Sequence, residues 1–335
     1  MKAAVFHGPR DVRTEDVPDP VLLPGDVLIR VRACGICGSD LHTYKHGLFP
    51  ELGVPIDSGR ILGHEFSGDV ADVNGEVPGI SVGDRVTSIF MGGNAELVRI
   101  PALVTPAVFR LPDSVSYEEA ATVEPLANSV HAVGLANVGG GETCVVLGVG
   151  IIGLGMIQVL KAKAPGTIIA VDLSDRRLEM AKELGAEVVI NAAREDAYAR
   201  VIDLTGSVPI GWTETAEPAA NVDVVFDCAG AAIGQEGSSL QEGLRLVKEN
   251  GKVIVVAVPE RPVEIQSALL VRKGASIIGS WAWTLDEFRE ALALIADKRV
   301  ERQCLVTHEF PLERAKEAYE TALSADECIK VVLKP

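Results

Sequence analysis

The sequence predicts an α/β protein that consists of a mostly-β domain and a doubly wound domain built on a parallel sheet. Three observations predict this class. Residues 1 to about 130 are rich in Pro and Gly and break into short β runs, whereas apolar strands alternate with helical patterns over residues 137–270. Within the second part, the glycine-rich segment GVGIIG lies between a strand and a helix. We therefore expect a first domain of residues 1–136 and 271–335, and a parallel-sheet domain of residues 137–270.

Composition limits the classes of partner. The chain has 335 residues, 47% of them hydrophobic, and a formal net charge of −16. This acidity disfavours nucleic acid and anionic membranes as partners, because both select for basic surfaces. No apolar run reaches the roughly 18 residues that span a bilayer, and the first residues show no secretory signal pattern. The six cysteines are scattered, several of them in apolar runs, which is typical of a reducing compartment, so we expect a cytoplasmic protein.

Local patterns place the elements of the first domain. In residues 26–33, DVLIRVRA, apolar and arginine side chains alternate, which predicts a strand with one buried face. Residues 83–89 and 95–101 are expected to be further strands bounded by Gly and Pro. After residue 270 we expect a strand at 276–280, helices at 284–299 and 312–324, and a final strand at 328–334.

The second domain is expected to alternate strands and helices. Residues 142–190 show the order strand, glycine turn, helix, strand, helix, strand, and the first strand is nearly all apolar, as in a parallel sheet covered on both faces. Ser174 is expected to cap the second helix and Gly185 to end it. A strand in VDVVFDCAG, a helix toward LRLVKENG and the strand KVIVVAV follow, and the polar residues 205–221 are expected to form a loop.

The glycines of GVGIIG match a dinucleotide-binding turn. Gly148, Gly150 and Gly153 have the spacing G-x-G-x-x-G, and the segment follows an apolar strand and opens a helix. The first glycine permits the tight turn, the second lets the backbone approach a pyrophosphate, and the third lets helix and strand pack closely. The pyrophosphate is then expected on the free N–H groups of the helix N-terminus, at Ile151 and Ile152.

A carboxylate at the end of the next strand bears on the choice of cofactor. Asp172 lies about 19 residues beyond Gly153, where such motifs place the acid that binds the adenosine ribose. Its charge would repel a 2′-phosphate, so NAD is favoured over NADP. Arg176 and Arg177 leave this choice open, since either offers a counter-charge to a phosphate, and Arg177 is counted among the expected cofactor-binding residues.

A nicotinamide cofactor carries hydride, so another group must deprotonate or stabilise the substrate oxygen. Cys37, His64, Glu65 and Glu124 offer a thiolate, an imidazole and carboxylates, all of them ligands that zinc accepts. Three protein ligands with an open fourth position make a catalytic zinc site, whereas four cysteines make a structural one. Cys34 and Cys37 have CxxC spacing, but no second CxxC completes a four-cysteine clip, and the stretch leads out of a β segment rather than opening a thioredoxin-like helix.

These motifs together resemble the zinc-dependent medium-chain alcohol dehydrogenases, in the polyol branch that includes sorbitol, 2,3-butanediol and L-threonine dehydrogenases. The matching motifs occur in order over nearly the whole chain: PGDVLIRVRACGICGSDLH, GHEFSG, GDRV, EPLANSVHA, GVGIIG, VDLSDRRLEMAKELGA and IKVVLKP. The resemblance implies a GroES-like catalytic domain, a Rossmann domain that binds NAD, and a catalytic zinc ion. It also implies a homodimer or a homotetramer.

The family's metal ligands correspond to four residues of this chain. The resemblance makes Cys37, which Gly-Ser-Asp follows, the metal-binding cysteine, and Cys34 a residue of the supporting strand. His64 is the second ligand, and Glu124 takes the place that a cysteine fills in simple alcohol dehydrogenases. Members of the branch differ in whether the residue at Glu65 or that at Glu124 contacts zinc directly or through water, and the sequence leaves this choice open.

Three further residues resemble auxiliary groups of the family. Asp40 matches the carboxylate that orients the imidazole ligand. Ser39 matches the hydroxyl that passes the substrate proton onward, and His42 the relay that passes it toward solvent. With Ser39, His42 and Glu65 as the expected catalytic residues, zinc would act as a Lewis acid on the substrate hydroxyl, and hydride would pass to the nicotinamide.

One departure from the family concerns a second metal. Most relatives carry a lobe with four cysteines after GDRV, which binds a structural zinc, whereas residues 83–101 of this chain contain no cysteine. We therefore expect one catalytic zinc per chain and no structural zinc. The missing lobe also weakens any transfer of the relatives' oligomeric state.

The predicted activity is oxidation of a secondary alcohol of a small diol, polyol or amino alcohol to the ketone, since a vicinal hydroxyl or amine suits an acidic ligand set. Two alternatives stay open: an NADP-dependent zinc alcohol dehydrogenase of another substrate class, and a zinc-free enzyme like the quinone reductases. A non-catalytic role would tolerate loss of the ligands or of the glycine turn, and neither is lost.

Overall fold

The computed structural model divides the chain into two compact units. Unit 1 comprises residues 1–124 and 288–335, and unit 2 comprises residues 125–287. The structure describes residues 1–49, 54–163, 166–210, 218–230, 237–259, 261–324 and 328–335.

The divisions between the units fall inside two continuous helices. Helix α3 (Val123–Ala136) begins in unit 1 and continues into unit 2, and helix α9 (Leu285–Ala296) returns the chain to unit 1. The texture of the sequence changes only near residues 137 and 270, because most of α3 is apolar and its pattern does not reveal which unit it packs in. The strand expected at residues 276–280 pairs with a strand of unit 2 and therefore belongs to that unit.

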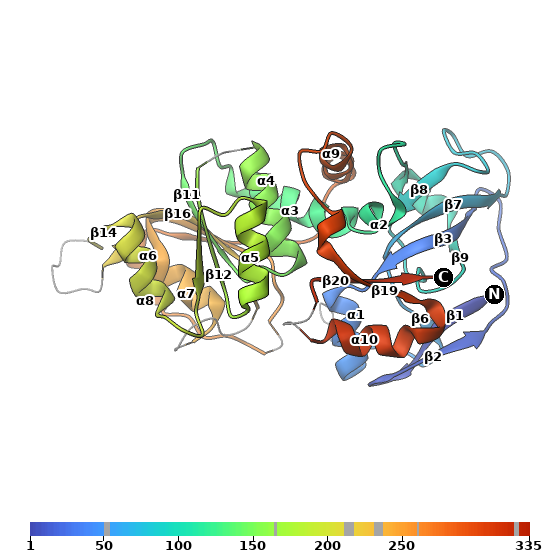
Figure 1. The fold of residues 1–335 in the computed structure, drawn as a ribbon, viewed down its shortest axis with the longest axis horizontal. Helices are drawn as coiled ribbons and strands as arrows, with labels where there is room; N and C mark the ends of the chain where they lie inside the picture. Colours follow the sequence, from blue (N-terminus) through green and yellow to red (C-terminus); the bar gives the residue numbers. More distant parts are fainter. Residues whose placement is uncertain (50–53, 164–165, 211–217, 231–236, 260, 325–327) are drawn as a thin grey trace. The chain divides into compact units, whose positions relative to one another are not determined.

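Unit 1 is built on a mostly antiparallel sheet with the order β10-β8-β7-β3-β20-β19, in which β9 also pairs with β3 (Figure 1). Its strands are β3 (Val27–Gly35), β7 (Glu65–Val73), β8 (Arg85–Ser88), β9 (Leu97–Ile100), β10 (Val108–Arg110), β19 (Val306–Pro311) and β20 (Lys330–Lys334). The predicted alternation in β3 is confirmed: Val27, Ile29 and Val31 are at most 1% exposed, whereas Arg30 and Arg32 are exposed. This buried face forms one core of the unit.

Smaller elements complete unit 1. A three-stranded sheet with the order β2-β1-β6 is joined by a short β4-β5 pair and three helices. The bounds are β1 (Lys2–Gly8), β2 (Asp11–Asp16), β4 (Leu48–Phe49), β5 (Val54–Pro55), β6 (Arg60–Ile61), α1 (Gly38–His46), α2 (Tyr117–Ala120) and α10 (Ala315–Ala322). The 3₁₀ turns are η1 (Ala102–Ala107), η2 (Gln303–Leu305) and η3 (Leu312–Arg314).

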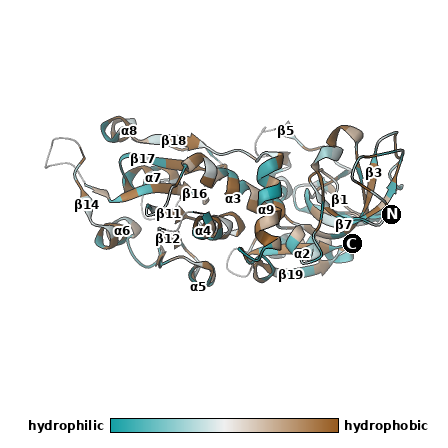
Figure 2. Cartoon of the chain, turned by 90° about the horizontal axis from the view of Figure 1, so that it is seen from above, coloured by the Kyte–Doolittle hydropathy of each residue, from teal (hydrophilic) through white to brown (hydrophobic). Residues whose placement is uncertain are grey.

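Unit 2 contains a six-stranded parallel sheet with the order β13-β12-β11-β16-β17-β18, in which successive strands run outward from β11 in both directions. Its strands are β11 (Thr143–Leu147), β12 (Thr167–Asp172), β13 (Val188–Asn191), β16 (Val222–Asp227), β17 (Val247–Val255) and β18 (Ser276–Gly279). Figure 2 shows these strands largely in the brown of apolar residues, as expected for a sheet covered on both faces. This order places the topological switch point between β11 and β16.

Helices pack on both faces of this sheet. On one face, Gly153 of α4 packs against Val146. On the other face, Gly243 of α7 packs against Val225 and Val253, and these two valines belong to a hydrophobic core that also contains residues of α6. The helices are α4 (Ile151–Lys163), α5 (Asp175–Leu184), α6 (Ala197–Thr205), α7 (Ser239–Leu246) and α8 (Ser267–Lys273). The bounds of α5 confirm Ser174 and Gly185 as its flanking residues.

Two expectations for unit 2 need correction. The helix expected toward LRLVKENG ends at Leu246, because Val247 already begins β17 and pairs with Val222 of β16. The segment 205–221, expected as a loop, contains a short antiparallel pair, β14 (Ser207–Val208) with β15 (Ala219–Ala220), and its residues 211–217 lie outside the described residues. Among the helices that the structure describes, none combines the length and apolar character needed to cross a membrane.

Candidate active site

Strand pairing brings the predicted metal ligands of unit 1 together. Strands β3 and β7 are antiparallel, and their register pairs Gly35 with Glu65. Cys37 follows the end of β3, and His64 precedes the start of β7, so both lie at the same edge of the sheet. Cys37 and His64 are therefore neighbours, although an extended chain of almost thirty residues would span roughly 90 Å.

Cys37, His64 and Glu65 form the cluster that this register creates. Each offers one ligand atom, and these atoms all lie within 4.8 Å of one another. Glu65 is buried, while Cys37 and His64 are half-buried. Cys34, by contrast, is 0% exposed and packs in the core on the same strand, in keeping with a structural role.

A buried lysine forms an ion pair with Glu65. Lys330 Nζ lies 2.5 Å from Glu65 Oε2 and donates to the carbonyl oxygen of Ile36 at 2.9 Å, and both charged side chains are at most 2% exposed. Gly35 makes room for this pair, because a Cβ at that position would lie 2.5 Å from Glu65 Oε2. Since β20 pairs with β3, the lysine reaches the cluster from the C-terminal strand.

Asp40 braces the backbone on either side of the cluster. Its carboxylate accepts hydrogen bonds from the backbone N–H of Cys37 at 3.2 Å and of Gly63 at 3.3 Å. It therefore connects the turn that carries Cys37 with the turn that carries His64. Asp40 Oδ1 lies 3.8 Å from His64 Nδ1, which is beyond hydrogen-bond distance.

The protonation of the cluster reflects burial and mutual attraction. Burial raises the pKa of the Cys37 thiol, Glu65 raises it further, and His64 opposes the shift. Burial alone would lower the pKa of His64, but Cys37, Asp40 and Glu124 together raise it well above its ordinary value. The pKa of His64 is raised because several acidic groups surround the imidazole, so the cluster favours a positive charge at this place.

The donor set fits zinc. A thiolate, an imidazole and a carboxylate are the ligand types of catalytic zinc sites, which use three protein ligands. His64 Nδ1 is buried and has no hydrogen-bond partner within the described ranges, a situation that proteins avoid unless another group or ion satisfies the atom. In the part of the chain that the structure describes, this is the group of three or more His, Cys, Asp and Glu residues able to hold a metal.

The other predicted residues of unit 1 lie around this cluster. Glu124 is half-buried in the first turn of α3 and influences the pKa of His64, but it does not belong to the three-residue cluster. Ser39 and His42 are three residues apart on α1, so they share a face of the helix. His42 Nδ1 lies 3.3 Å from the carbonyl oxygen of Leu48.

The glycine turn of unit 2 has the geometry that its motif requires. Gly148 has φ of 83°, and a Cβ there would lie 2.8 Å from the Cα of Ala229. A Cβ on Gly153 would lie 2.0 Å from the carbonyl oxygen of Gly148, whereas on Gly150 the nearest atom is 3.9 Å away. Two glycines are thus needed for internal packing, and the middle one leaves open space on the backbone, as a pyrophosphate contact requires. Ile151 begins α4, so the N–H groups of Ile151, Ile152 and Gly153 lie in its first turn.

Asp172 lies at the end of β12, next to the glycine turn. Its carboxylate accepts hydrogen bonds from the backbone N–H of Val149 at 2.7 Å, of Leu173 at 2.7 Å and of Ser174 at 2.9 Å. The side chain therefore helps to hold the turn. Arg177 of α5 is half-buried, and its Nη1 is the atom closest to the Cβ position of Gly150.

Sequence reasoning missed several residues of these sites. Lys330 and Arg302 are buried cations of unit 1, and Asp227 ends β16 beside the switch point of unit 2. Burial raises the pKa of Asp227, while Ser239 and two backbone N–H groups oppose the shift. The signal that could have indicated Lys330 is a lysine inside the apolar run of the last strand. Arg302 lies in the polar stretch VERQC, which gives no indication of burial.

Comparisons with known proteins agree with this arrangement. Residues 23–113 match the alcohol dehydrogenase GroES-like domain, and residues 152–297 match the zinc-binding dehydrogenase family. Sorbitol dehydrogenase of Bacillus subtilis is 32% identical over 100% of this chain and 97% of the relative, and (R,R)-butanediol dehydrogenase of the same organism is 30% identical over the full length of both. The crystal structure of Bacillus subtilis 2R,3R-butanediol dehydrogenase covers 100% of this chain and 99% of its own with a TM-score of 0.84 at 30% identity.

A GroES-like β unit with a Cys–His–Glu cluster and a doubly wound parallel sheet define a metal-dependent dehydrogenase. The chain belongs to the zinc-dependent medium-chain alcohol dehydrogenase family, in its polyol branch.

Proposed function

We propose that the chain is an NAD-dependent zinc dehydrogenase that oxidises a secondary alcohol of a small diol, polyol or amino alcohol to the ketone. The observation that carries the proposal is the cluster of Cys37, His64 and Glu65, whose ligand atoms lie within 4.8 Å of one another. Similarity to a sorbitol dehydrogenase and a butanediol dehydrogenase supports the substrate class. In the net reaction the alcohol gives a hydride to the nicotinamide ring and releases one proton.

The cluster would hold the zinc ion through Cys37, His64 and one of two glutamates. A bound zinc ion supplies Lewis acidity, which lowers the pKa of a substrate hydroxyl that would otherwise stay protonated. Glu65 offers Oε1 to a metal, because Oε2 already faces Lys330. Glu124, in the first turn of α3, is the other candidate for the carboxylate ligand. Asp40 keeps the two turns of the site in place through its backbone hydrogen bonds.

Ser39 and His42 would carry the proton away. Ser39 Oγ would accept the proton of the substrate hydroxyl and donate its own toward His42 on the same face of α1. If His42 Nδ1–H donates to the carbonyl oxygen of Leu48, 3.3 Å away, Nε2 is left as the basic atom that accepts the proton. Fixing the tautomer in this way gives the relay one direction.

The glycine turn would bind the cofactor. The N–H groups of Ile151 and Ile152 would receive the pyrophosphate at the N-terminus of α4, which favours negative charge. Asp172 would accept the ribose hydroxyls and disfavour a 2′-phosphate, so NAD is the proposed cofactor. Arg177, beside the glycine turn, would contact the ribose or the pyrophosphate.

The proposal is tested by following NAD reduction at alkaline pH with 2,3-butanediol, sorbitol, xylitol, threonine and simple alcohols. We expect activity with a vicinal diol, polyol or amino alcohol, about one zinc per chain, and loss of activity with a strong chelator. Cys37→Ala should lose zinc and at least 100-fold in kcat/KM, a drop of about 3 kcal/mol in transition-state stabilisation. Cys304→Ala, which changes an exposed cysteine of the same unit, is the matched control and should match the wild type. A fully active Cys37→Ala variant, or a wild type that works without metal, would refute the proposal.

The cofactor preference has its own test. We expect kcat/KM to be at least about 10-fold higher with NAD than with NADP, since a 2′-phosphate beside the Asp172 carboxylate is repelled. A preference for NADP would instead indicate that Arg176 or Arg177 binds the phosphate. That result would replace NAD as the cofactor and leave the zinc chemistry intact.

We also propose that the enzyme is a cytoplasmic homo-oligomer, either a dimer or a tetramer. No disulfide joins any of the six cysteines, all of which lie in the described residues, and this suits a reducing compartment. Light scattering coupled to size-exclusion chromatography would give the subunit number, and fractionation of the source cells would give the compartment. A stable monomer, or export of the protein, would contradict these two points separately.

A further inference from the structure

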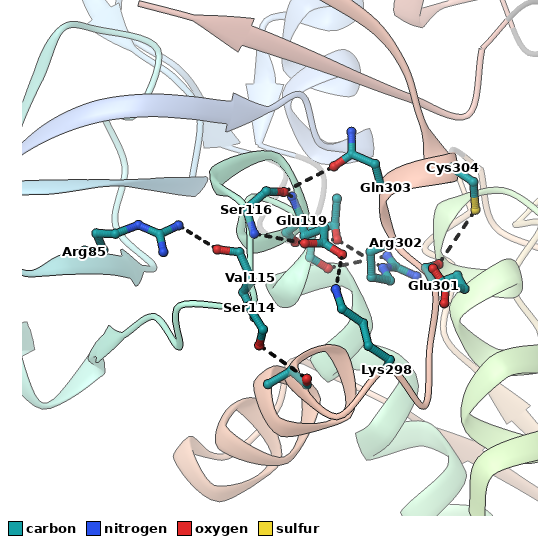
Figure 3. A network of polar contacts seen from close by, with 12 residues as sticks. Arg85, Ser114, Val115, Ser116, Glu119, Lys298, Glu301, Arg302, Gln303 and Cys304 are labelled. Carbon is teal, nitrogen blue, oxygen red and sulfur yellow. Dashed lines mark hydrogen bonds and ion pairs between the residues drawn. The ribbon is translucent and has the colours of Figure 1, made fainter.

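Arg302 is a buried cation of unit 1 to which the proposed mechanism assigns no role. It lies just before η2, and its side chain is 0% exposed. Arg302 Nε donates to Thr122 Oγ1 at 3.0 Å, and Nη2 donates to the carbonyl oxygen of Thr122 at 3.4 Å (Figure 3). Nη1 is buried and has no hydrogen-bond partner among the described residues.

Such a side chain needs a compensating partner. A buried guanidinium without a hydrogen-bonded carboxylate is unfavourable, because it loses its hydration without gaining a close negative charge. Burial lowers the pKa of Arg302 to about 10, while Cys304 and Glu65 act in the opposite direction, so the group stays positive at neutral pH. Packing alone does not account for such a group, since an apolar side chain would fill the same space at a lower free-energy cost.

Arg302 holds the turn that leads into α3. Thr122 donates through its hydroxyl to the carbonyl oxygen of Glu119 at 2.7 Å, and its backbone N–H reaches the same oxygen at 2.9 Å. The turn is therefore closed on one side by Glu119 and on the other by the guanidinium. Glu124 follows two residues later in the first turn of the helix.

The charges around the cluster indicate a second contribution. Four acidic groups lie in or next to the cluster, namely Cys37, Asp40, Glu65 and Glu124. One buried cation, Lys330, is paired with Glu65, and Arg302 is a second buried cation whose charge also acts on Glu65. Removing Arg302 would take away one of these two positive charges.

We propose that Arg302 is a positioning residue of the metal site, which fixes the Thr122 turn that carries Glu124 and adds a buried positive charge at this turn. This inference rests on the proposed function, because it assumes that the cluster holds zinc. The inference predicts that Arg302, from the C-terminal part of unit 1, affects metal affinity and not only the stability of the fold.

The test compares three variants at this turn. Arg302→Met removes the charge and the donors at similar length, and Arg302→Lys keeps the charge but loses the two-point contact. Lys298→Met is the control, because Lys298 Nζ bonds Glu119 Oε1 of the same turn at 3.0 Å and the lysine is half-exposed (Figure 3). The zinc dissociation constant of each purified holoenzyme is measured by chelator competition, and thermal melting is recorded on the same samples.

We expect zinc affinity to fall at least about 10-fold in Arg302→Met, as is typical when groups that support metal ligands are removed. The affinity should fall to an intermediate degree in Arg302→Lys and by less than about twofold in Lys298→Met. Arg302→Met with unchanged zinc affinity and a lower melting temperature would overturn the inference. If Arg302→Met does not fold, Thr122→Val, which removes the hydroxyl acceptor, decides instead: at least threefold weaker zinc binding supports the inference, and unchanged binding overturns it. A wild type that binds no zinc would overturn both this inference and the proposed function, whereas equal zinc binding by wild type and variants overturns this inference alone.

Discussion

Replacing Lys330 with Met should be strongly destabilising for the metal-free protein. The substitution removes the positive charge that lies 2.5 Å from Glu65 Oε2, and it removes the donor to the carbonyl oxygen of Ile36 at 2.9 Å. Burial would lower the pKa of Lys330, but Glu65 and Cys37 raise it above its ordinary value, so the ammonium is the relevant form at neutral pH.

The structure sets the expected size of this effect. The side chains of Lys330 and Glu65 are at most 2% exposed, so water cannot solvate the carboxylate that the substitution leaves behind. Removing one partner of a buried ion pair costs about 3–5 kcal/mol. At about 2–4 °C per kcal/mol for a domain of this size, the melting temperature of the zinc-free protein should fall by at least about 6 °C.

The assay is calorimetry of the zinc-stripped protein, with a double mutant and a matched control. Lys330→Met combined with Glu65→Gln should regain most of the lost stability, because the uncompensated charge is gone. Lys252→Met makes the same chemical change at a half-buried lysine that donates to the carbonyl oxygen of Ala136 at 2.7 Å, and it should cost only about 1 kcal/mol. If Lys330→Met melts like Lys252→Met, or the double mutant is no more stable than Lys330→Met, the buried charge is not what the lysine compensates.

Three further predictions concern unit 2. Gly153→Ala should weaken NAD binding at least about 10-fold in a fluorescence titration with zinc content unchanged, because its Cβ would lie 2.0 Å from the carbonyl oxygen of Gly148 and must displace the phosphate-binding turn; normal NAD affinity would contradict this. Burial would raise the pKa of Glu287, but hydrogen bonds from a backbone N–H and from the His131 ring outweigh burial, so the folded pKa is below its ordinary value. This carboxylate therefore stabilises the fold at pH values above its ordinary pKa, and the stabilisation is lost as the pH falls through the lower folded pKa. Glu287→Gln should therefore cost about 1 kcal/mol near pH 7 and almost nothing near pH 3 in urea titrations, and a pH-independent difference would count against it. Lys273→Met should cost about 2–3 kcal/mol by the same measurement, because Nζ donates to three carbonyl oxygens at the end of α7 at 2.5–2.7 Å, and a variant as stable as the wild type would exclude that role.

Elements with a strong local pattern were predictable from the sequence. The alternation in β3 and the apolar run of β11 predict their strands, and the spacing of Gly148, Gly150 and Gly153 predicts the turn between β11 and α4. These features depend on neighbouring residues alone. The division of the chain was less visible, because α3 and α9 are continuous helices that cross from one unit to the other.

The candidate metal site was partly predictable. The ligand types and their motifs indicated Cys37, His64, Glu65 and Glu124, but only strand register shows that the first three share one edge of a sheet. The distances between ligand atoms then leave Glu124 out of their cluster. No local pattern indicates which carboxylate acquires a buried lysine as its partner. That pairing is set by β20, which joins β3 from the far end of the chain.

The sequence by itself therefore determined the class of fold, the glycine turn and the chemical types of the ligands, because each is encoded in short patterns of size, charge and hydrophobicity. Tertiary structure decided which charges lie together and in what surroundings. Lys330 and Arg302 acquire their significance only through burial next to Glu65 and Thr122. The physical reason is that electrostatic effects depend on distance and on exclusion of water, and both are properties of the folded chain rather than of its local sequence.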